Sequence, residues 1–591
     1  MKGTRTKIIC TIGPSVSSVE SMMELMLAGM NVARLNFSHG THQEHLEMIL
    51  RLKEAREKLG IPLAIMLDTK GPEIRVGKLE NGEVYLPPKH LWHLVDEPII
   101  GNAVKATILP SKILKNLKVG TTVLFDNGYI LSKVVETTEN GVVVQIENGG
   151  VIKSSKGVNI PNFVLDIPAM TEKDIEDIRF GCKNDVDIIA ASFIRSADHV
   201  VEIKELLNNE QQSPILVIAK IESGEGVKNF DQIVQVADGI MIARGDLGVE
   251  LPLSQVPKLQ KMMIKKCINV GKPAIIATQM LETMMYNTRP TRAETSDVAN
   301  AIYESTSAVM LSGETAVGQY PIETVHVMRS IIEETESDFD YNVFFEKFSS
   351  LSFRGIPSAV ALATVKTANS TDAKAIFVYT STGATARILS RFRPQIPIIA
   401  MTPSKKCYYQ LAFTWGVIPF LAEDVNTPEQ AFERISKFAL DRKLVEYGDL
   451  VVVIAGVPFG ITGTTNMMFV ESIGEVWVRG QKGIGSTKQG IISILLSPES
   501  KKPFEVRQKF LVINRCDATY KQHIIESSGI VLDNALDDTD SEKYLLEIAE
   551  RHGKSAILRA EGASRILREE AFVTLDPEKG IVTRAGNIRR M

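Results

Sequence analysis

At 591 residues, the chain is longer than one hydrophobic core can organise, so several domains are expected. The composition, 44% hydrophobic and 23% charged, excludes a mainly disordered chain. Lys and Arg total 67 and Asp and Glu total 71, and the net charge of −4 gives no general attraction to nucleic acid or to an anionic membrane, so neither is expected as a partner.

Short apolar runs alternate with amphipathic helical stretches through the first part of the chain and again through its middle. Strands buried on both faces and joined by helices form parallel sheets, and eight of them in sequence favour a closed (β/α)₈ TIM barrel over an open sheet. We predict this α/β barrel over residues 1–70 and 169–344, with strands in the runs at 7–13, 31–38, 63–69, 187–193, 215–222, 239–244, 273–280 and 307–313.

Residues 71–168 interrupt the alternation after the third predicted strand. The pattern there changes to short alternating runs separated by Gly and Asn turns, such as GTTVLFDNG and VVVQIENGG. This is typical of an inserted all-β domain, and we expect a small β-barrel. An insertion after a barrel strand lies over the active-site end, so we expect a lid.

Two further domains are expected after the barrel. Over 345–475, three strand-like runs at 373–383, 396–403 and 449–458 alternate with helices, which predicts an open α/β domain. The final segment, 476–591, has its own alternation of strands and helices and is predicted to be a small extra α/β domain.

Reactive side chains follow the apolar runs of the predicted barrel, and the carboxyl ends of its strands share one face. Isolated polar residues there would mean little, but repeated charges at the ends of buried strands are costly unless they serve one site. The residues concerned are Arg34, Asn36 and Ser38; Asp68, Thr69 and Arg75; Lys220 and Glu222; Arg244, Gly245 and Asp246; Thr278 and Gln279; and Ser312 and Glu314.

The types of these side chains indicate phosphoryl transfer assisted by a metal ion. Glu222 and Asp246 provide hard carboxylate oxygens, which suit Mg²⁺ or Mn²⁺ when substrate oxygens and water complete the coordination. Arg34, Arg75 and Lys220 provide cations for phosphate. Phosphoryl transfer needs mainly positioning and charge stabilisation, which such a set supplies. The sequence contains no GxxxxGK[ST] motif, so a P-loop enzyme is excluded.

Seven long motifs make the chain similar to the pyruvate kinase family over residues 1 to about 475. They are MNVARLNFSHG (30–40), LDTKGPEIRVG (67–77), IAKIESGEG (218–226), IARGDLGVE (242–250), ATQMLETMM (277–285), TRAETSDVANAIYE (291–304) and VMLSGETAVGQYP (309–321). The resemblance implies transfer of the phosphoryl group of phosphoenolpyruvate to ADP, giving pyruvate and ATP. It also implies a homotetramer and the cofactors Mg²⁺ (or Mn²⁺) and K⁺.

The resemblance also assigns roles to individual residues. Lys220 stabilises the phosphoryl group in transfer, Arg34 holds it, and Thr278 takes part in protonating the enolate. Gly245 and Asp246 contact the substrate, and Glu222 and Asp246 hold the divalent ion. The monovalent-cation site is implied at Asn36, Ser38, Asp68 and Thr69, and the nucleotide site at Asn36, Arg75 and Lys156.

Two positions near the lid bear on these roles. The lid turn FDNG has Asn127 where the family usually shows a second acidic residue before Gly. Glu73 stands where K⁺-dependent members commonly have Glu and K⁺-independent members commonly have Lys, so dependence on K⁺ is expected. The alternative is that Glu73 only pairs with a nearby Arg.

A turn rich in hydroxyl groups, TSTGATAR (380–387), opens a predicted helix in the C-terminal α/β domain. Such a turn can bind phosphate or can simply cap the helix. The resemblance implies a phosphorylated allosteric effector there, which would contact Thr380, Ser381, Thr382, Gly383 and Thr385.

The last segment resembles the mobile phosphohistidine domain of phosphoenolpyruvate-utilising enzymes, which extends some bacterial pyruvate kinases. Such domains carry a Thr-Ser-His centre, and no such centre is found here. His523 and His552 have no neighbouring Thr-Ser and are expected at the surface. A structural or regulatory role is therefore expected for this domain.

Two other functions remain open at this point, a non-catalytic scaffold on the same fold and a metal-dependent aldolase of the enolpyruvate group. Retention of every expected active-site residue argues against the scaffold, and the lid and the SGETA segment argue against the aldolase. The five cysteines form no CxxC pair, the first residues lack the apolar segment of a signal peptide, and no apolar run reaches the length of a membrane span. A cytoplasmic enzyme is expected.

Overall fold

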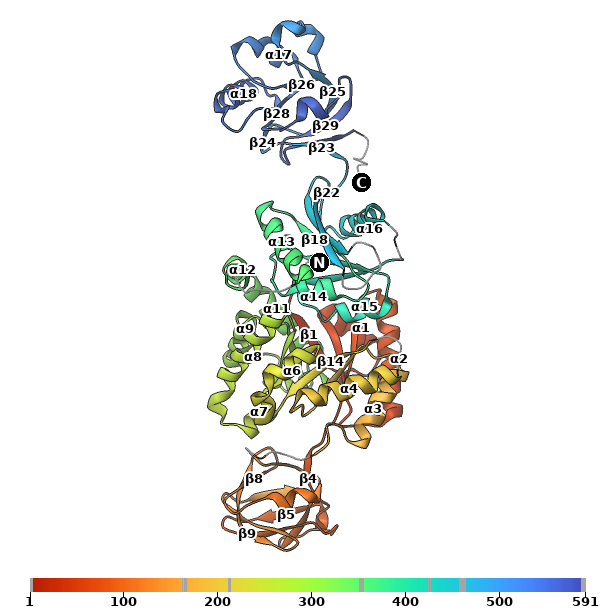
Figure 1. Cartoon of the computed structure of the whole chain (residues 1–591), viewed down its shortest axis with the longest axis vertical. Coiled ribbons are helices and arrows are strands. Elements are labelled where there is room, and N and C mark those ends of the chain that lie inside the picture. The colour runs from red at the N-terminus through yellow and green to blue at the C-terminus, as the bar shows by residue number, and fades with distance from the viewer. Residues whose placement is uncertain are drawn as a thin grey trace. The chain divides into compact units, whose positions relative to one another are not determined.

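All eight predicted barrel strands form, and they close into one parallel barrel in the order β1-β17-β16-β15-β14-β13-β3-β2, which confirms the predicted fold class (Figure 1). The structure is a computed structural model, and it describes residues 4–161, 163, 167–210, 214–349, 355–423, 425, 427–456 and 464–585. The barrel strands are β1 (Lys7–Thr11), β2 (Met30–Asn36), β3 (Ala64–Asp68), β13 (Ile188–Ala191), β14 (Leu216–Ile221), β15 (Gly239–Ala243), β16 (Ala274–Ala277) and β17 (Ala308–Leu311).

Helices surround this barrel, as Figure 1 shows. Capping boxes at Ser18, Thr41, Thr171 and Thr291 begin four of them, because each hydroxyl accepts an otherwise unpaired backbone N–H. The helices are α1 (Val19–Ala28), α2 (His42–Leu59), α3 (Glu172–Lys183), α4 (Ala197–Glu210), α5 (Gly224–Lys228), α6 (Phe230–Val236), α7 (Arg244–Glu250), α8 (Val256–Val270), α9 (Arg292–Tyr303), α10 (Gly313–Ala316) and α11 (Pro321–Asp338).

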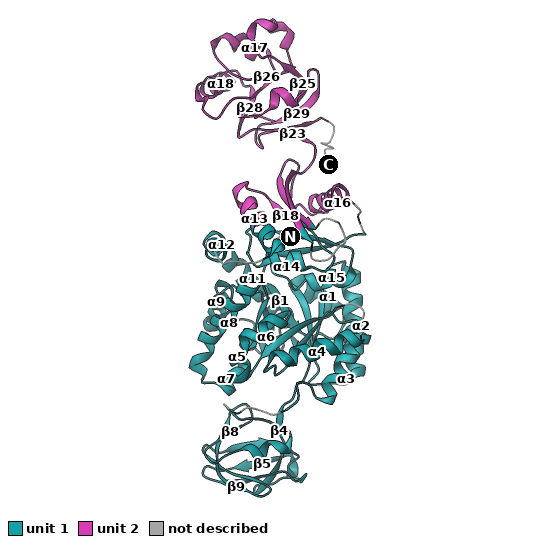
Figure 2. Ribbon diagram, viewed as in Figure 1, with its two compact units in different colours: residues 1–362, 378–424, 456–465 teal, residues 363–377, 425–455, 466–591 magenta. Residues whose placement is uncertain are grey.

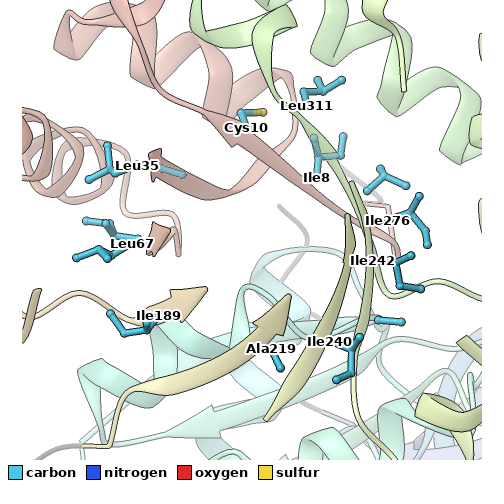
Figure 3. Close-up of a cluster of buried hydrophobic side chains, with 14 of the residues drawn as sticks. Ile8, Cys10, Leu35, Leu67, Ile189, Ala219, Ile240, Ile242, Ile276 and Leu311 are labelled. Carbon is cyan, nitrogen blue, oxygen red and sulfur yellow. The ribbon is translucent and has the colours of Figure 1, made fainter. Parts of the chain in front are cut away.

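The barrel strands bury both of their faces. One set of side chains packs against the helices, and Figure 3 shows several of its members, among them Leu35, Leu67 and Ile240. The alternate set forms a second cluster that fills the barrel, and it includes Val32, Met66, Ala190 and Ile218. Because side chains alternate along a strand, residues two positions further on share this inner face. The inner face therefore ends in Arg34, Asp68, Ser192 and Lys220.

The segment between β3 and α3 forms a second closed barrel in the order β10-β6-β7-β4-β12-β8-β9, beside a two-stranded sheet of β11 and β5. Its core surrounds the fully buried Trp92 and Phe125, whose rings meet edge to face 5.3 Å apart. The strands are β4 (Ile74–Val76), β5 (Glu83–Leu86), β6 (Leu91–Val95), β7 (Lys105–Leu109), β8 (Thr122–Phe125), β9 (Ile130–Thr138), β10 (Gly141–Ile146), β11 (Gly150–Lys153) and β12 (Gly157–Asn159).

A five-stranded sheet in the order β20-β19-β18-β21-β22 follows the barrel. The three predicted strands are present, but the prediction missed β20 (VIPFL) and β22 (TNMMFVES), which are short or mixed in polarity and contain few fully buried residues. The elements are α12 (Tyr341–Ser349), α13 (Ile356–Ser370), β18 (Ala375–Tyr379), α14 (Ala384–Ser390), β19 (Ile398–Thr402), α15 (Lys405–Leu411), β20 (Val417–Leu421), α16 (Pro428–Asp441), β21 (Leu450–Gly456) and β22 (Thr465–Ser472).

The last part of the chain contains an eight-stranded mixed sheet in the order β23-β30-β29-β25-β26-β27-β28-β24. Its elements are β23 (Val476–Arg479), β24 (Lys482–Ile484), β25 (Lys488–Ile494), β26 (Phe510–Ile513), α17 (Lys521–Glu526), β27 (Gly529–Leu532), α18 (Thr539–Arg551), β28 (Ser555–Leu558), α19 (Ala563–Ile566), β29 (Phe572–Asp576) and β30 (Ile581–Arg584).

The two histidines of this last part differ in exposure. His552 follows α18 and is exposed, as expected. The expectation for His523 was wrong, because it is buried and its Nε2 lies 2.8 Å from the carbonyl oxygen of Lys501. Its ring contacts the backbone of half-buried Lys501.

Two compact units divide the chain, residues 1–362, 378–424 and 456–465 in one, and 363–377, 425–455 and 466–591 in the other (Figure 2). All five cysteines are unpaired and buried. No helix within the described ranges is both long and apolar enough to cross a membrane.

Candidate active site

Asp68 is the centre of the charged layer that closes the inner face of the barrel. The carboxylate is fully buried at the end of β3. It accepts hydrogen bonds from Arg34 Nε at 2.6 Å and from Lys220 Nζ at 3.0 Å. Burial alone would raise the pKa of Asp68, but Arg34 and Lys220 outweigh it and hold that pKa below its usual value. Asp68 is therefore ionised and paired with two cations.

Ser192 joins this layer, although the sequence analysis did not single it out. Its Oγ accepts a hydrogen bond from Lys220 Nζ at 2.7 Å and donates one to the carbonyl oxygen of Thr69 at 2.6 Å. The signal was present in the sequence, since Ser192 is the polar residue just after the apolar run of β13. The rule that identified Asp68 on β3 would have found it.

Glu222 faces Lys220 from the other side, with Oε1 3.1 Å from Nζ. Burial alone would lower the pKa of Lys220, but Asp68 and Glu222 raise it above its usual value. Burial raises the pKa of Glu222 to about 7, with Lys220 opposing the shift and Asp246 adding to it. A cation bound beside Glu222 and Asp246 would relieve this cost.

Glu222 and Asp246 fit a divalent ion by their chemistry, as a pair of carboxylates rather than a complete cage. Glu222 is buried, and half-buried Asp246 lies in the first turn of α7. The Phe193 N–H donates to Glu222 Oε2 at 2.5 Å and so fixes that oxygen, which leaves Oε1 toward Lys220. Within the described ranges, no three His, Cys, Asp or Glu side chains gather to hold a metal. The remaining ligands would have to be substrate oxygens and water, as Mg²⁺ commonly has.

Thr278 lies in a backbone conformation that non-glycine residues rarely adopt, with φ of 68°, and Gln279 follows with φ of 54°. Arg244 holds this turn. Its Nη1 donates to both oxygens of Asp297, at 2.9 and 2.7 Å, and its Nη2 donates to the Thr278 carbonyl at 2.7 Å. The Gly245 N–H donates to Thr278 Oγ1 at 2.9 Å. Gly245 and Thr278, which were predicted to share a site, are therefore in direct contact.

Glu314 supports the same turn from α10, which follows β17. Its buried carboxylate accepts the N–H groups of Ser312 at 2.7 Å and of Leu281 at 3.2 Å. Burial raises the pKa of Glu314, and the backbone N–H donors oppose that shift. Ser312 and Glu314 thus act through the backbone, and exposed Gln279 makes no side-chain contact with this layer in the described structure.

The four residues of the predicted monovalent-cation site follow β2 and β3. Asn36 Oδ1 accepts the Ser38 N–H at 3.2 Å, and Thr69 Oγ1 accepts the Ser192 N–H at 3.2 Å. Asp68 is the one carboxylate of this set, and it already pairs with Arg34 and Lys220. The set consists of three residues with neutral side-chain oxygens and one carboxylate.

Of the two predicted nucleotide residues of the lid, Arg75 lies on β4 and Lys156 lies between β11 and β12. Arg75 on β4 donates through Nη1 to the Ser155 carbonyl at 2.8 Å, and Lys156 Nζ lies 2.8 Å from Asp126 Oδ1. Glu73 pairs with Arg75, Nε to Oε2 at 2.6 Å, so the ion pair raised as the alternative for Glu73 is present.

The turn that contains Asn127 explains the departure noted there. Asp126, Asn127 and Gly128 all have positive φ, at 50°, 56° and 83°. Asn tolerates this left-handed backbone better than most residues, and Gly tolerates it without cost. Asn127 therefore suits the shape of the turn between β8 and β9.

A cavity of about 660 Å³ lies beside these residues, between the barrel and the lid. Barrel residues Asp246 and Glu250 line it together with lid-side residues Glu73 and Asn127. Its lining includes a contact between the two parts, since Asn159 Nδ2 donates to Glu250 Oε1 at 3.2 Å. The cavity is large enough for a ligand of the size of a nucleotide.

The predicted effector turn, residues 380–385, joins β18 to α14. Gly383 has φ of 79° and donates its N–H to Thr380 Oγ1 at 2.9 Å. Thr385 Oγ1 shares a hydrogen bond of 2.6 Å with Thr465 Oγ1, and the Thr382 carbonyl accepts from Arg387 at 2.9 Å. The Thr380 hydroxyl therefore stabilises the turn itself, and the Thr385 hydroxyl is engaged with β22.

Two family descriptions match the sequence. The first, pyruvate kinase barrel domain, matches residues 3–325, and the second, pyruvate kinase alpha/beta domain, matches residues 358–471. Together they cover the parts of the chain that carry the predicted site and effector residues, and they set aside the aldolase alternative.

Curated relatives extend this similarity. A pyruvate kinase of Geobacillus stearothermophilus is 41% identical over 583 residues, 98% of each chain. A pyruvate kinase of Clostridium acetobutylicum is 45% identical over 470 residues, which cover 79% of this chain and 99% of that protein. The crystal structure of a pyruvate kinase from Cryptosporidium parvum aligns with a TM-score of 0.76 and 37% identity, over 80% of this chain and 96% of the other.

The charged layer generates one prediction about stability. Asp68→Asn removes the anion shared by buried Arg34 and Lys220, so we expect a loss of about 3–5 kcal/mol in the free energy of unfolding, measured by urea denaturation at pH 7. Because the pKa of Asp68 is lowered in the folded state, this contribution is present above about pH 4 and is lost as pH falls through the lowered value. Asp231→Asn, which removes one partner of an exposed ion pair with Lys266, should change stability by less than about 0.5 kcal/mol. Equal stability of Asp68→Asn and the unmutated chain would contradict the pairing.

Proposed function

The chain belongs to the pyruvate kinase family and is a phosphotransferase of glycolysis, and we propose that its phosphoryl transfer takes place at the charged layer around Lys220. The reaction moves the phosphoryl group of phosphoenolpyruvate to ADP and yields pyruvate and ATP. The observation that carries the proposal is the buried Arg34–Asp68–Lys220–Glu222 array beside the cavity that Asp246 lines.

Lys220 and Arg34 are proposed to hold the phosphoryl group. Both side chains are nearly buried, so their charge acts in a medium that screens it poorly. Asp68 and Ser192 fix the ammonium of Lys220 from two sides, which leaves little motion to be frozen during the reaction. A cation already held in place stabilises the charge of the group in transfer without reorganisation.

Pyruvate kinases generally need a divalent metal and potassium. For this chain we propose that Glu222 and Asp246 hold Mg²⁺ or Mn²⁺. The bound ion would neutralise negative charge on the substrate oxygens. The raised pKa of Glu222 supports this assignment, because burial and the nearby Asp246 disfavour its charged form and a bound cation would offset that cost.

Thr278 is proposed to stand near the methylene carbon of the substrate and to take part in protonating the enolate. Its hydroxyl already belongs to a polar chain, since Oγ1 donates to the Ala277 carbonyl at 2.6 Å and accepts from Gly245 N–H. Gly245 and Asp246 are proposed to contact the substrate at the start of α7. Arg244 is a positioning residue that holds the turn.

Arg75, Lys156 and Asn36 are proposed to bind the nucleotide. Arg75 and Lys156 are chain neighbours of Ile74 and Gly157, which line the cavity, and their two cations suit the phosphates of ADP. Asn36, Ser38, Asp68 and Thr69 are proposed to hold K⁺ through the oxygens that follow β2 and β3.

The remaining proposals concern regulation, assembly and compartment. A phosphorylated effector is proposed to bind residues 380–385, and the assembly is proposed to be a homotetramer, as the family resemblance implies. Five unpaired, buried cysteines are compatible with a reducing cytoplasm, which is the proposed compartment.

The last segment, 476–591, is proposed to be structural or regulatory. The pyruvate kinase from Clostridium acetobutylicum aligns over 99% of its own length but covers only 79% of this chain. That protein is therefore shorter and has no counterpart to about a fifth of this chain. Lys579 and Ile581 of this segment lie against residues 446–448, where Lys579 Nζ lies 2.8 Å from Glu446 Oε2. These contacts favour a stabilising role.

Lys220→Met should lower kcat by at least about 10²–10³-fold, because it removes the cation that stabilises the transferring group. The measurement is a coupled assay for pyruvate from phosphoenolpyruvate and ADP, with thermal unfolding to show that the variant is folded. Lys261→Met, at a lysine whose side chain is 67% exposed, is the matched control and should keep normal turnover. Near-normal turnover of a folded Lys220→Met variant would contradict the assignment.

Glu222→Gln and Asp246→Asn should each raise the Mg²⁺ concentration needed for half-maximal activity, because one of two anionic ligands is lost. Mg²⁺ titration of activity gives the midpoint, and Mn²⁺-detected relaxation of water protons gives metal affinity without turnover. Glu225→Gln, at a carboxylate that lines the same cavity, is the control. Unchanged midpoints and unchanged Mn²⁺ affinity in both variants would argue against the metal site.

Activity should rise strongly when K⁺ replaces a bulky organic cation at constant ionic strength. Glu73→Lys should weaken this response, since a lysine ammonium can supply the charge that K⁺ brings. Because Glu73 pairs with Arg75, Glu73→Gln is the necessary control, as it breaks the pair without adding a cation. If Gln and Lys have the same effect, Glu73 acts only through Arg75, and equal rates of the unmutated chain with and without K⁺ would rule out K⁺ dependence.

A chain that ends at residue 475 should retain phosphoryl transfer and unfold at a lower temperature, because residues 446–448 lose the contacts of Lys579 and Ile581. The two measurements are the coupled assay and thermal unfolding. Lys579→Ala in the full chain removes the ion pair with Glu446 and the hydrogen bond to the Tyr447 carbonyl but keeps the contact of Ile581, and should cause a smaller decrease. Complete loss of activity in a folded truncated chain would show a direct role for this segment in the reaction.

A further inference from the structure

A cluster of basic side chains surrounds a small cavity at the amino-terminal end of the barrel strands, opposite the charged layer. The cavity has a volume of about 30 Å³ and is lined by Lys272, which precedes β16, and by Arg387, Arg391 and Arg393, in and after α14. Leu216, Ser307 and Trp415 complete part of its wall. Phosphoryl transfer gives no role to this cluster.

Arg393 is the most buried member, with 4% of its surface exposed. Its Nη2 donates to the Ser305 carbonyl at 2.9 Å and to Ser307 Oγ at 3.0 Å, and its guanidinium lies 4.2 Å from the centre of the Trp415 ring. Its Nε and Nη1 are buried without a hydrogen-bond partner. Burial lowers the pKa of Arg393 to about 9, against the smaller opposing effects of Glu336 and Tyr341. A buried cation with two unsatisfied donors calls for an acceptor.

Arg387, which also lines the cavity, repeats this pattern. Its Nη2 donates to the Thr382 carbonyl, while its Nη1 is buried without a partner. Burial lowers the pKa of Arg387, and burial likewise lowers that of Lys272. Two arginines of the cluster therefore each leave at least one N–H group unsatisfied.

Protein carboxylates do not balance this charge. Asp238 is the acidic residue of the lining, but its Oδ1 pairs with Lys204 at 2.9 Å and its Oδ2 accepts the Val217 N–H at 2.9 Å. Across the described part of the chain, no carboxylate lies within 4 Å of the charged nitrogens of Lys272, Arg387 or Arg393. The cavity is thus lined by more positive than negative charge.

We propose that this cavity binds one small inorganic anion of about the size of chloride. The volume of about 30 Å³ suits a single small ion, since a cavity needs about 10–15 Å³ of such space to hold one water molecule. Guanidinium groups that stack on an aromatic ring and carry free N–H donors are suited to hold such an anion. The anion would join Arg387 and Arg393 to Lys272 at the base of the barrel and would stabilise the fold without contacting the reacting groups.

Thermal unfolding in potassium chloride and in potassium gluconate, at equal K⁺ concentration, tests the proposal. Chloride can enter the cavity and gluconate is too large, so we expect chloride to raise Tm by about 1–4 °C. Lys272→Gln and Arg393→Met should lose this rise, and the half-buried position of Lys272 keeps the test available if Arg393→Met does not fold. Lys261→Gln, at an exposed lysine, should keep the full rise.

Crystals grown with bromide in place of chloride give a direct second measurement. An anomalous peak in the cavity of the unmutated chain, absent in Lys272→Gln, would support the site. The proposal is overturned by an equal Tm in the two salts, by a chloride effect of the same size in Lys272→Gln, or by no bromide peak among Lys272, Arg387 and Arg393.

Discussion

The pairing of Asp68 with Arg34 and Lys220 is the interaction on which the active-site end of the barrel depends. An isolated charge at that depth would be displaced or neutralised, because burial costs each ion several kcal/mol. Two cations that share Asp68, with Glu222 as a second anion beside Lys220, can remain charged next to the apolar layer formed by Val32, Met66 and Ile218. The barrel can therefore end in reactive groups without losing its core.

The turn at Thr278 also depends on paired polar groups, but here side chains pair with backbone groups rather than with one another. Two consecutive residues with left-handed φ persist because Arg244 and Glu314 satisfy the polar groups of the turn. Arg244 is in turn fixed by Asp297 from α9. Residues far from the reacting atoms thus determine where the Thr278 hydroxyl lies.

Much of this arrangement was predictable from periodicity. Eight apolar runs of strand length specify the barrel, and the residue two positions beyond an inward-facing one is the next to face inward, which finds Arg34, Asp68 and Lys220. Partners are harder to predict, because whether Glu73 meets Arg75 or an ion depends on how a loop folds. Strands β20 and β22 were missed since their residues are only partly buried, and His523 was misjudged because a single histidine carries no period. The same two-residue rule also identifies Ser192, to which the sequence analysis did not apply it.

The reactivity of the five buried, unpaired cysteines can be used to measure local opening of the fold. Cys10, Cys182 and Cys267 lie in the barrel, Cys407 on α15 and Cys516 in the last part of the chain. Burial raises the pKa of Cys10 and Cys267, and raises that of Cys516 to about 12, so these thiols are almost unreactive while they remain enclosed. A thiol reagent can then modify each one only when its own surroundings open. The order in which the five sulfurs react would show which parts of the chain undergo local unfolding and which become accessible only on global unfolding.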